Sequence, residues 1–258
     1  MKVICETTGE AHELAPLGVR LYLGGCGYGC LYCYGHRSMK RIRQAFENHA
    51  RLKPEVLRCL DRDAQRIRGD DREILITFSS DPYQPLETQW GTTRQAIQLL
   101  IHHDLRVMIL TKGGMRAARD FDLLETYEKS KFGTSVVFTN QADASEWEPN
   151  APSVADRIRA IHQAHGRGIT TWVCLEPVID PDQALELIRM LHPVVDHWEV
   201  GILNYRKLPR PVDWLQFRAN AEELLESLGA DYHLKESLAA LQGLPKAEER
   251  STGKWKKT

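Results

Sequence analysis

The chain has 258 residues, of which 42% are hydrophobic and 27% are charged, and its formal net charge at pH 7 is −1. This composition is typical of a globular protein with a sizeable core, and the balanced charge excludes an overall electrostatic attraction to polyanions. Because no apolar run reaches the roughly 18 residues of a membrane span and no signal-peptide core is present, we expect a cytoplasmic protein with reduced thiols.

Short apolar runs alternate with amphipathic stretches along the chain. The runs predict buried strands at 20–23, 73–78, 106–111, 134–139, 170–175 and 198–202. The stretches between them predict helices at 54–68, 92–102, 115–129, 154–165, 181–191 and 212–228. Strands that are apolar throughout and alternate with helices are typical of a parallel sheet. We therefore expect an α/β fold, a partial (β/α)6 TIM-type barrel, with a doubly wound open sheet as the alternative.

The predicted units follow one another without a break in composition, which indicates one barrel domain at 20–205. Residues 1–19 are expected to be an N-terminal extension. Residues 206–258 are expected to form a C-terminal helical segment with a basic tail, packed on the barrel.

Polar side chains recur where the predicted strands end. In α/β barrels the loops at these carboxyl ends build the active site. Each polar residue could instead cap a helix or form a turn, but their recurrence favours a site. The residues concerned are Ser79, Ser80, Asp81, Thr111, Lys112, Asn140, Glu176 and Asn204.

Three cysteines, Cys26, Cys30 and Cys33, follow the first predicted strand at C-x3-C-x2-C spacing, in the stretch GGCGYGCLYCYGHRS. A reducing compartment disfavours a disulfide. Zinc could take the three thiolates and His36. An iron–sulfur cluster normally takes four thiolates, so three would leave one iron open to another ligand. The glycines of the loop favour the cluster, because they let the backbone wrap closely around a bulky group.

The C-x3-C-x-Φ-C pattern at the end of a first strand resembles the signature of the radical S-adenosylmethionine (SAM) superfamily. Further segments resemble the spore photoproduct lyase-like branch of that superfamily: FSSDPYQPLE, LTKGG, SEWEPNAP, LEPVIDP and VGILNY, within 20–205. The resemblance implies a barrel of the radical SAM type. It also implies a [4Fe–4S] cluster on Cys26, Cys30 and Cys33, whose fourth iron binds SAM.

The resemblance also implies roles for individual residues around SAM. Tyr32 is expected beside the adenine, and Ser80 and Asp81 near the amino group. Lys112 and, less strongly, Ser135 are expected near the carboxylate. Each of these has an ordinary structural alternative, such as an Asp-Pro turn at Asp81 or a solvated loop lysine at Lys112.

Three further residues are expected to face the substrate or the reaction. Glu176 is expected at the ribose or the substrate, and Tyr34 is expected to assist hydrogen transfer. The lyase has a cysteine that donates hydrogen two residues before the serine matched by Ser80, and this chain has Phe78 there. Cys174 shares a strand face with Glu176 and is a candidate replacement, although a small core residue is the plainer interpretation.

The implied activity is that of a radical SAM enzyme that takes hydrogen from a substrate. A nucleic-acid base, in DNA repair or base modification, is the expected substrate, and the basic stretch 36–51 could contact phosphates. A reducing partner such as flavodoxin or ferredoxin is implied, and the oligomeric state stays open. The alternatives are a radical SAM enzyme acting on a small molecule or peptide, and a zinc-stabilised nucleic-acid-binding module without catalysis.

Overall fold

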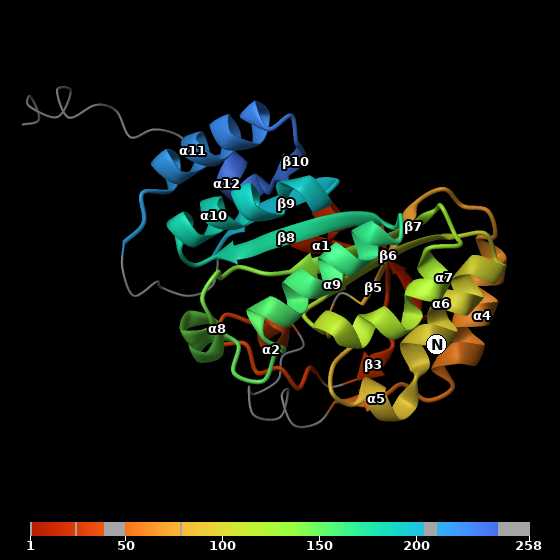
Figure 1. Cartoon of the computed structure of the whole chain (residues 1–258). Helices are drawn as coiled ribbons and strands as arrows, with labels where there is room; N and C mark the ends of the chain where they lie inside the picture. The colour runs from red at the N-terminus through yellow and green to blue at the C-terminus, as the bar shows by residue number, and fades with distance from the viewer. Residues whose placement is uncertain (1, 24, 39–49, 78, 204–210, 242–258) are drawn as a thin grey trace, which may run out of the picture.

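The structure is a computed structural model that describes residues 2–23, 25–38, 50–77, 79–203 and 211–241. Its described part centres on an eight-stranded sheet in the order β1-β2-β5-β6-β7-β8-β9-β10 (Figure 1). The strands are β1 Ile4–Glu6, β2 Leu17–Val19, β5 Glu73–Ile76, β6 Arg106–Thr111, β7 Ser130–Ser135, β8 Thr170–Val178, β9 His197–Ile202 and β10 Asp231–Leu234. Two further strands, β3 Tyr22–Leu23 and β4 Arg51–Leu52, form a separate antiparallel pair.

The sheet is parallel from β2 to β10, and β1 alone runs antiparallel to its neighbour. Spatial order follows chain order from β5 onward. A doubly wound sheet would reverse its strand order at a switch point, so this alternative is excluded. The predicted α/β fold with a barrel-type parallel sheet is confirmed.

The helices connect the parallel strands, and α6, α9 and α10 pack against the sheet (Figure 1). Asn140, Ser153, Asp180 and Asp213 cap α8, α9, α10 and α11 by accepting hydrogen bonds from backbone N–H groups, as N-cap residues do. The helices are α1 Glu10–Leu14, α2 Gly35–Ser38, α4 Val56–Arg66, α5 Glu87–Trp90, α6 Thr92–His102, α7 Phe121–Leu124, α8 Gln141–Trp147, α9 Val154–Gly166, α10 Pro181–Leu191, α11 Trp214–Ser227 and α12 Glu236–Ala239, and the 3-10 helices are η1 Gly114–Asp120 and η2 His192–Val194.

Two predicted strands are shifted along the chain. The first parallel strand is Leu17–Val19 rather than 20–23, because exposed Arg20 ends the buried run. The fourth is Ser130–Ser135 rather than 134–139. A Cβ on Gly133 would lie 2.2 Å from the indole of Trp172, so only glycine lets β7 pair closely with β8 at this point. Val136, Val137 and Phe138 are buried beyond the end of the strand.

Other predicted elements differ in type. The stretch 115–129 contains the 3-10 helix η1 and the short α7 instead of one long helix. The C-terminal segment contains β10 in addition to helices, and β10 extends the sheet beside β9. Strands β2 and β10 thus lie outside residues 20–205, and the division of the chain at residues 19 and 205 stays a prediction.

The core lies on both faces of the sheet. The larger cluster packs between the sheet and the helices. A smaller one lies on the opposite, inner face, because side chains alternate along a strand. Its buried members are Ala15, Leu75, Met108, Trp172 and Cys174. Among the helices that the structure describes, none combines the length and apolar character that crossing a bilayer requires.

Candidate functional site

A cavity of about 220 Å³ is built from the loops at the carboxyl ends of the strands, the cysteine loop and α1. The carboxyl ends of parallel strands meet at one edge of a sheet, so residues far apart in the chain converge there. Eleven of the predicted site residues line this cavity: Cys26, Cys30, Tyr32, Cys33, Tyr34, Ser80, Asp81, Lys112, Ser135, Cys174 and Glu176.

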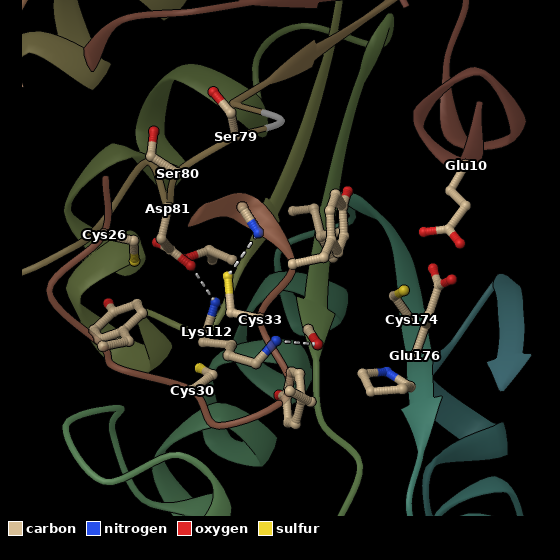
Figure 2. A pocket seen from close by; sticks show the side chains of 18 of the residues that line it. Glu10, Cys26, Cys30, Cys33, Ser79, Ser80, Asp81, Lys112, Cys174 and Glu176 are labelled. Atoms are coloured by element: carbon tan, nitrogen blue, oxygen red, sulfur yellow. Dashed lines mark hydrogen bonds between the residues drawn. The ribbon is translucent and has the colours of Figure 1, made fainter. Parts of the chain in front are cut away.

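The cysteines lie on one side of the cavity, across from Cys174 and Glu176 (Figure 2). All six cysteines of the chain are described, and none forms a disulfide. Burial, followed by the charge of Asp81, holds the pKa of Cys26 well above its usual value. Burial also raises the pKa of Cys30 to about 12. Burial thus favours the protonated form of both thiols, and a bound metal group would take them as thiolates.

The backbone of the cysteine loop is held from two sides. Leu31 N–H donates to the carbonyl of Trp147 at 2.7 Å, and the hydroxyl of Tyr28 donates to the carbonyl of Tyr83 at 2.7 Å. Between Tyr28 and Cys30 the chain turns at Gly29, whose φ of 67° is a left-handed conformation that favours glycine. The loop is thus fixed by its backbone, and its thiols line the cavity.

The donor set distinguishes a single ion from a cluster. Among the described residues, no three His, Cys, Asp or Glu side chains are arranged to hold one metal ion. His36, the fourth ligand of the zinc alternative, has its Nδ1 3.0 Å from the carbonyl oxygen of Cys33. A four-iron cluster binds each thiolate at a different iron, so its ligands stand farther apart than the ligands of one ion.

A buried amide beside the cysteine loop also fits a cluster. Gln84 Oε1 accepts from Gly27 N–H at 3.3 Å, and Gln84 is fully buried. Its Nε2 has no hydrogen-bond partner within the described parts of the chain. Buried donors are normally satisfied, and a sulfur-rich group next to the loop would accept this N–H. Cys26, Cys30 and Cys33 line the cavity and are the residues that could hold a [4Fe–4S] cluster.

Asp81 is held by the next strand end. Its Oδ1 accepts from the Thr111 hydroxyl at 2.6 Å and from Tyr83 N–H at 2.8 Å, and its Oδ2 accepts from Lys112 N–H at 2.7 Å. Burial raises the pKa of Asp81, although these donors oppose the rise. A carboxylate offers about four acceptor sites, so one site is left for a ligand.

Lys112 and Ser135 come together from neighbouring strand ends. Lys112 Nζ donates to Ser135 Oγ at 2.7 Å and lies 5.4 Å from the centre of the Tyr32 ring (Figure 2). Ser80 Oγ lies 3.0 Å from the hydroxyl of Thr77. One wall of the cavity thus combines a cation, two hydroxyls and an aromatic face.

Glu148, which the sequence reasoning missed, lies behind this wall. Its carboxylate is fully buried, pairs with Arg157 at 2.5 Å, lies 3.9 Å from Lys112 Nζ and accepts a hydrogen bond from Tyr32. Burial alone would lower the pKa of Lys112. Nearby negative charges, of which Glu148 is the strongest, outweigh burial and raise the pKa above its ordinary value. Glu148 lies in the segment SEWEPNAP, which resembles the lyase-like branch, but no local sequence pattern distinguishes a buried acidic residue from a solvated one.

The opposite wall carries Glu176 and Cys174 on β8. Cys174 pairs in register with Ser135 and is buried, which raises its pKa. Glu176 Oε2 lies 3.5 Å from Lys235 Nζ, and burial raises the pKa of Glu176 to about 7. Glu10 points toward Glu176 from α1 (Figure 2). Neither Glu10 nor Lys235 was singled out, because both lie outside the predicted barrel at 20–205.

Other predicted residues are placed differently. Asn140 caps α8, where its Oδ1 accepts from Asp143 N–H at 2.9 Å, and it does not line the cavity. The shift of β7 explains this, because Ser135 takes the strand-end position. Phe78, Asn204 and residues 39–49 of the basic stretch lie outside the described residues.

No family model and no curated protein sequence matches this chain. Solved structures do. SuiB of Streptococcus suis bound to S-adenosylmethionine is similar over 82% of this chain and 48% of its own, with a TM-score of 0.63 and 12% identity. Spore photoproduct lyase complexed with dinucleoside spore photoproduct is similar over 89% of this chain and 79% of its own, with a TM-score of 0.69 and 15% identity.

A mutant of the lyase with bound AdoMet and dinucleoside spore photoproduct is similar to the same degree, with a TM-score of 0.69, 15% identity and coverage of 89% and 78%. At such identities the likeness establishes the fold. The chain spans about half the length of SuiB. The predicted structural resemblance to spore photoproduct lyase is confirmed, and the expected partial barrel fold is confirmed with it.

Proposed function

We propose that this protein is a radical SAM enzyme whose cluster is held by Cys26, Cys30 and Cys33. When bound, a [4Fe–4S] cluster supplies the electron that splits SAM into methionine and a 5′-deoxyadenosyl radical, which takes a hydrogen atom from a substrate. The observation that carries the proposal is the convergence of three thiols and a ligand-binding wall in one cavity of a barrel with this fold.

The residues of that wall would bind and orient SAM. Asp81 has an acceptor site left for an ammonium group, and Ser80 lies beside it in the chain. Lys112 and Ser135 offer a cation and a hydroxyl to a carboxylate. Tyr32 offers a ring face to the adenine. In this arrangement each end of SAM has a partner of matching chemistry.

Hydrogen transfer is proposed to involve the wall of the cavity that carries Cys174 and Glu176. Cys174 is the candidate hydrogen donor, because the position two residues before Ser80 is occupied by Phe78, which has no weakly held hydrogen. Tyr34 lines the same cavity and is proposed to assist the transfer. A thiol raised in pKa by burial keeps its hydrogen at neutral pH.

The proposed substrate is a nucleic-acid base, most directly in DNA. A similar fold holds a dinucleoside spore photoproduct in the lyase. A base in a duplex would have to leave the stack to reach a cavity at the end of a barrel. The electron is proposed to come from reduced flavodoxin or ferredoxin in a reducing cytoplasm.

The test is anaerobic reconstitution with iron and sulfide, followed by dithionite and SAM. We expect a brown protein that bleaches on reduction and releases methionine and 5′-deoxyadenosine. Cys30→Ala should abolish both colour and release, while Cys5→Ser, in β1 and away from the cavity, should preserve them. A fully loaded protein that releases no methionine would contradict the proposal. A colourless protein with one tightly bound zinc would support the binding-module alternative instead.

A further inference from the structure

The wall that carries Glu176 is separate from the wall proposed to bind SAM. Lys112 directly follows β6, Ser135 is the last residue of β7, and Glu176 lies on β8, two residues beyond the register partner of Ser135. Figure 2 shows Asp81, Lys112, Cys26, Cys30 and Cys33 on one side, with Cys174, Glu176 and Glu10 on the other. A substrate that fills the space between the walls would therefore meet Glu176 on the side away from the cysteines.

Glu176 is held in place by a lysine from the last strand-to-helix connection. The Lys235 side chain is 1% exposed, and its Nζ donates to the carbonyl of Glu10 at 2.8 Å and lies 3.5 Å from Glu176 Oε2. Gly201 leaves room for both side chains, because a Cβ there would lie 2.9 Å from Lys235 and 3.0 Å from Glu176. The Glu176 side chain keeps 16% of its surface exposed, and it lines the cavity.

Apart from Lys235 and Glu10, apolar side chains lie on the same side of the chain's cavity as Glu176 or line it with Glu176. Leu14, Pro177, Ile202 and Leu203 line the cavity together with it. Enzymes that act on an extruded base stack the ring between apolar or aromatic side chains and read its hydrogen-bonding edge with polar groups. A carboxylate among apolar side chains suits a flat heteroaromatic ring better than a flexible amine, whose charge would need several polar partners.

We propose that Glu176, positioned by Lys235 and facing Glu10, reads the edge of the substrate base and selects a base that carries an amino group. Lys235, 3.5 Å from Glu176, favours the ionised form of this carboxyl group. An ionised carboxylate only accepts hydrogen bonds, and the amino groups of cytosine, adenine and guanine only donate them. Thymine offers a single N–H between two carbonyl oxygens, which the carboxylates would repel. The inference rests on the proposed function and narrows its substrate from any base to cytosine, adenine or guanine.

The experiment measures the binding of short, labelled oligonucleotides of dC, dA or dT to the cluster-loaded protein with SAM, without oxygen and at one fixed salt concentration. We expect dC or dA to bind about tenfold more tightly than dT, the effect of one well-placed polar contact to a base. Glu176→Gln should remove this preference, because an amide both donates and accepts. Glu223→Gln, exposed on α11 and outside the cavity, should leave it unchanged.

A thermal melt of each variant accompanies the binding data. If Glu176→Gln fails to fold, Glu10→Gln is measured instead, because this change leaves the pair between Glu176 and Lys235 intact. Glu10→Gln should weaken the preference for dC or dA over dT. Three results would each overturn the inference. The first is tighter binding of dT than of dC or dA, and the second is an unchanged preference in a folded Glu176→Gln protein. The third is a bound probe that an arginine peptide displaces and no oligonucleotide does. If one of these results occurs while the wild-type protein still releases methionine from SAM, only the inference fails and the proposed function stands. If the wild-type protein releases no methionine, the proposed function itself fails.

Discussion

Glu148 shows how one residue organises the wall proposed for SAM. Its fully buried carboxylate is shared by Arg157, Tyr32 and Lys112, which come from three separate segments of the chain. A buried ion pair contributes little relative to apolar packing, but the loss of one partner leaves the other charge buried without compensation. Arg157 is 1% exposed and cannot turn to solvent.

Glu148→Gln should therefore lower the free energy of unfolding by about 3 kcal/mol, because Arg157 stays buried without its counter-charge. Urea unfolding of the wild type and the variant measures this. Glu146→Gln, exposed on helix α8 just before Glu148, is the matched control and should change stability by less than about 0.5 kcal/mol. Equal losses in the two variants would show that the buried carboxylate has no special role.

At the scale of elements, the pairing of β9 with β10 is reinforced by a chain of titratable side chains. His197 Nδ1 lies 2.7 Å from Asp231 and its Nε2 lies 3.1 Å from Glu199, while His233 Nδ1 lies 3.0 Å from the other oxygen of Glu199. Burial lowers the pKa of His197, but the hydrogen bonds to Glu199 and Asp231 outweigh burial and raise it above its usual value. The doubly donating imidazolium is thus the form that fits this site.

The contribution of His197 to the pairing of β9 with β10 should consequently be larger at acidic pH than at basic pH. Since the folded pKa of His197 is raised, its contribution is fully present below the unfolded value of about 6.5 and is lost as pH rises through the folded value. We expect the urea midpoint to fall as pH rises from about 6 to 9. His197→Asn should flatten that dependence, and His162→Asn, exposed on α9, should keep it. A wild-type profile that rises over this range contradicts the assignment.

At the scale of the whole molecule, helix α1 near the N-terminus meets the segment after β10 near the other end of the described chain. Lys235 Nζ bonds to the carbonyl of Glu10, 225 residues away in sequence, and Glu236 N–H donates to Glu13 at 2.7 Å. Helix α1 thereby joins the segment that follows β10 (Figure 1). The N-terminal and C-terminal segments together complete the wall that holds Glu176.

Lys235→Met keeps much of the side-chain volume and removes the charge, which leaves Glu176 buried without its partner. We expect the free energy of unfolding to fall by about 3 kcal/mol. Lys129→Met removes a surface pair, 2.7 Å from Asp104, and should cost at most about 1 kcal/mol. Denaturant unfolding of both variants provides the comparison, and a smaller loss for Lys235 than for Lys129 would refute this account of how the ends are joined.

Local sequence patterns predicted much of the fold and most of the residues that line the cavity. The run 106–111 and the helices 92–102 and 181–191 lie where their periodicity predicts them, since burial on one side leaves a periodic trace in sequence. The predicted site residues share one cavity because they lie at or just beyond the carboxyl-terminal halves of parallel strands, which end at a common edge. Their roles in catalysis and cofactor binding stay predictions.

The sequence by itself determined the alternation of strands and helices, the cysteine loop and the polar residues at the strand ends, because these depend on neighbours close in the chain. Only the tertiary structure decided which residues complete the site. Strand β7 begins four residues early because Gly133 admits Trp172 from the next strand. Glu148 meets Tyr32, and Lys235 meets Glu10, through contacts far apart in sequence. Such contacts leave no local pattern, because they depend on how the whole barrel closes.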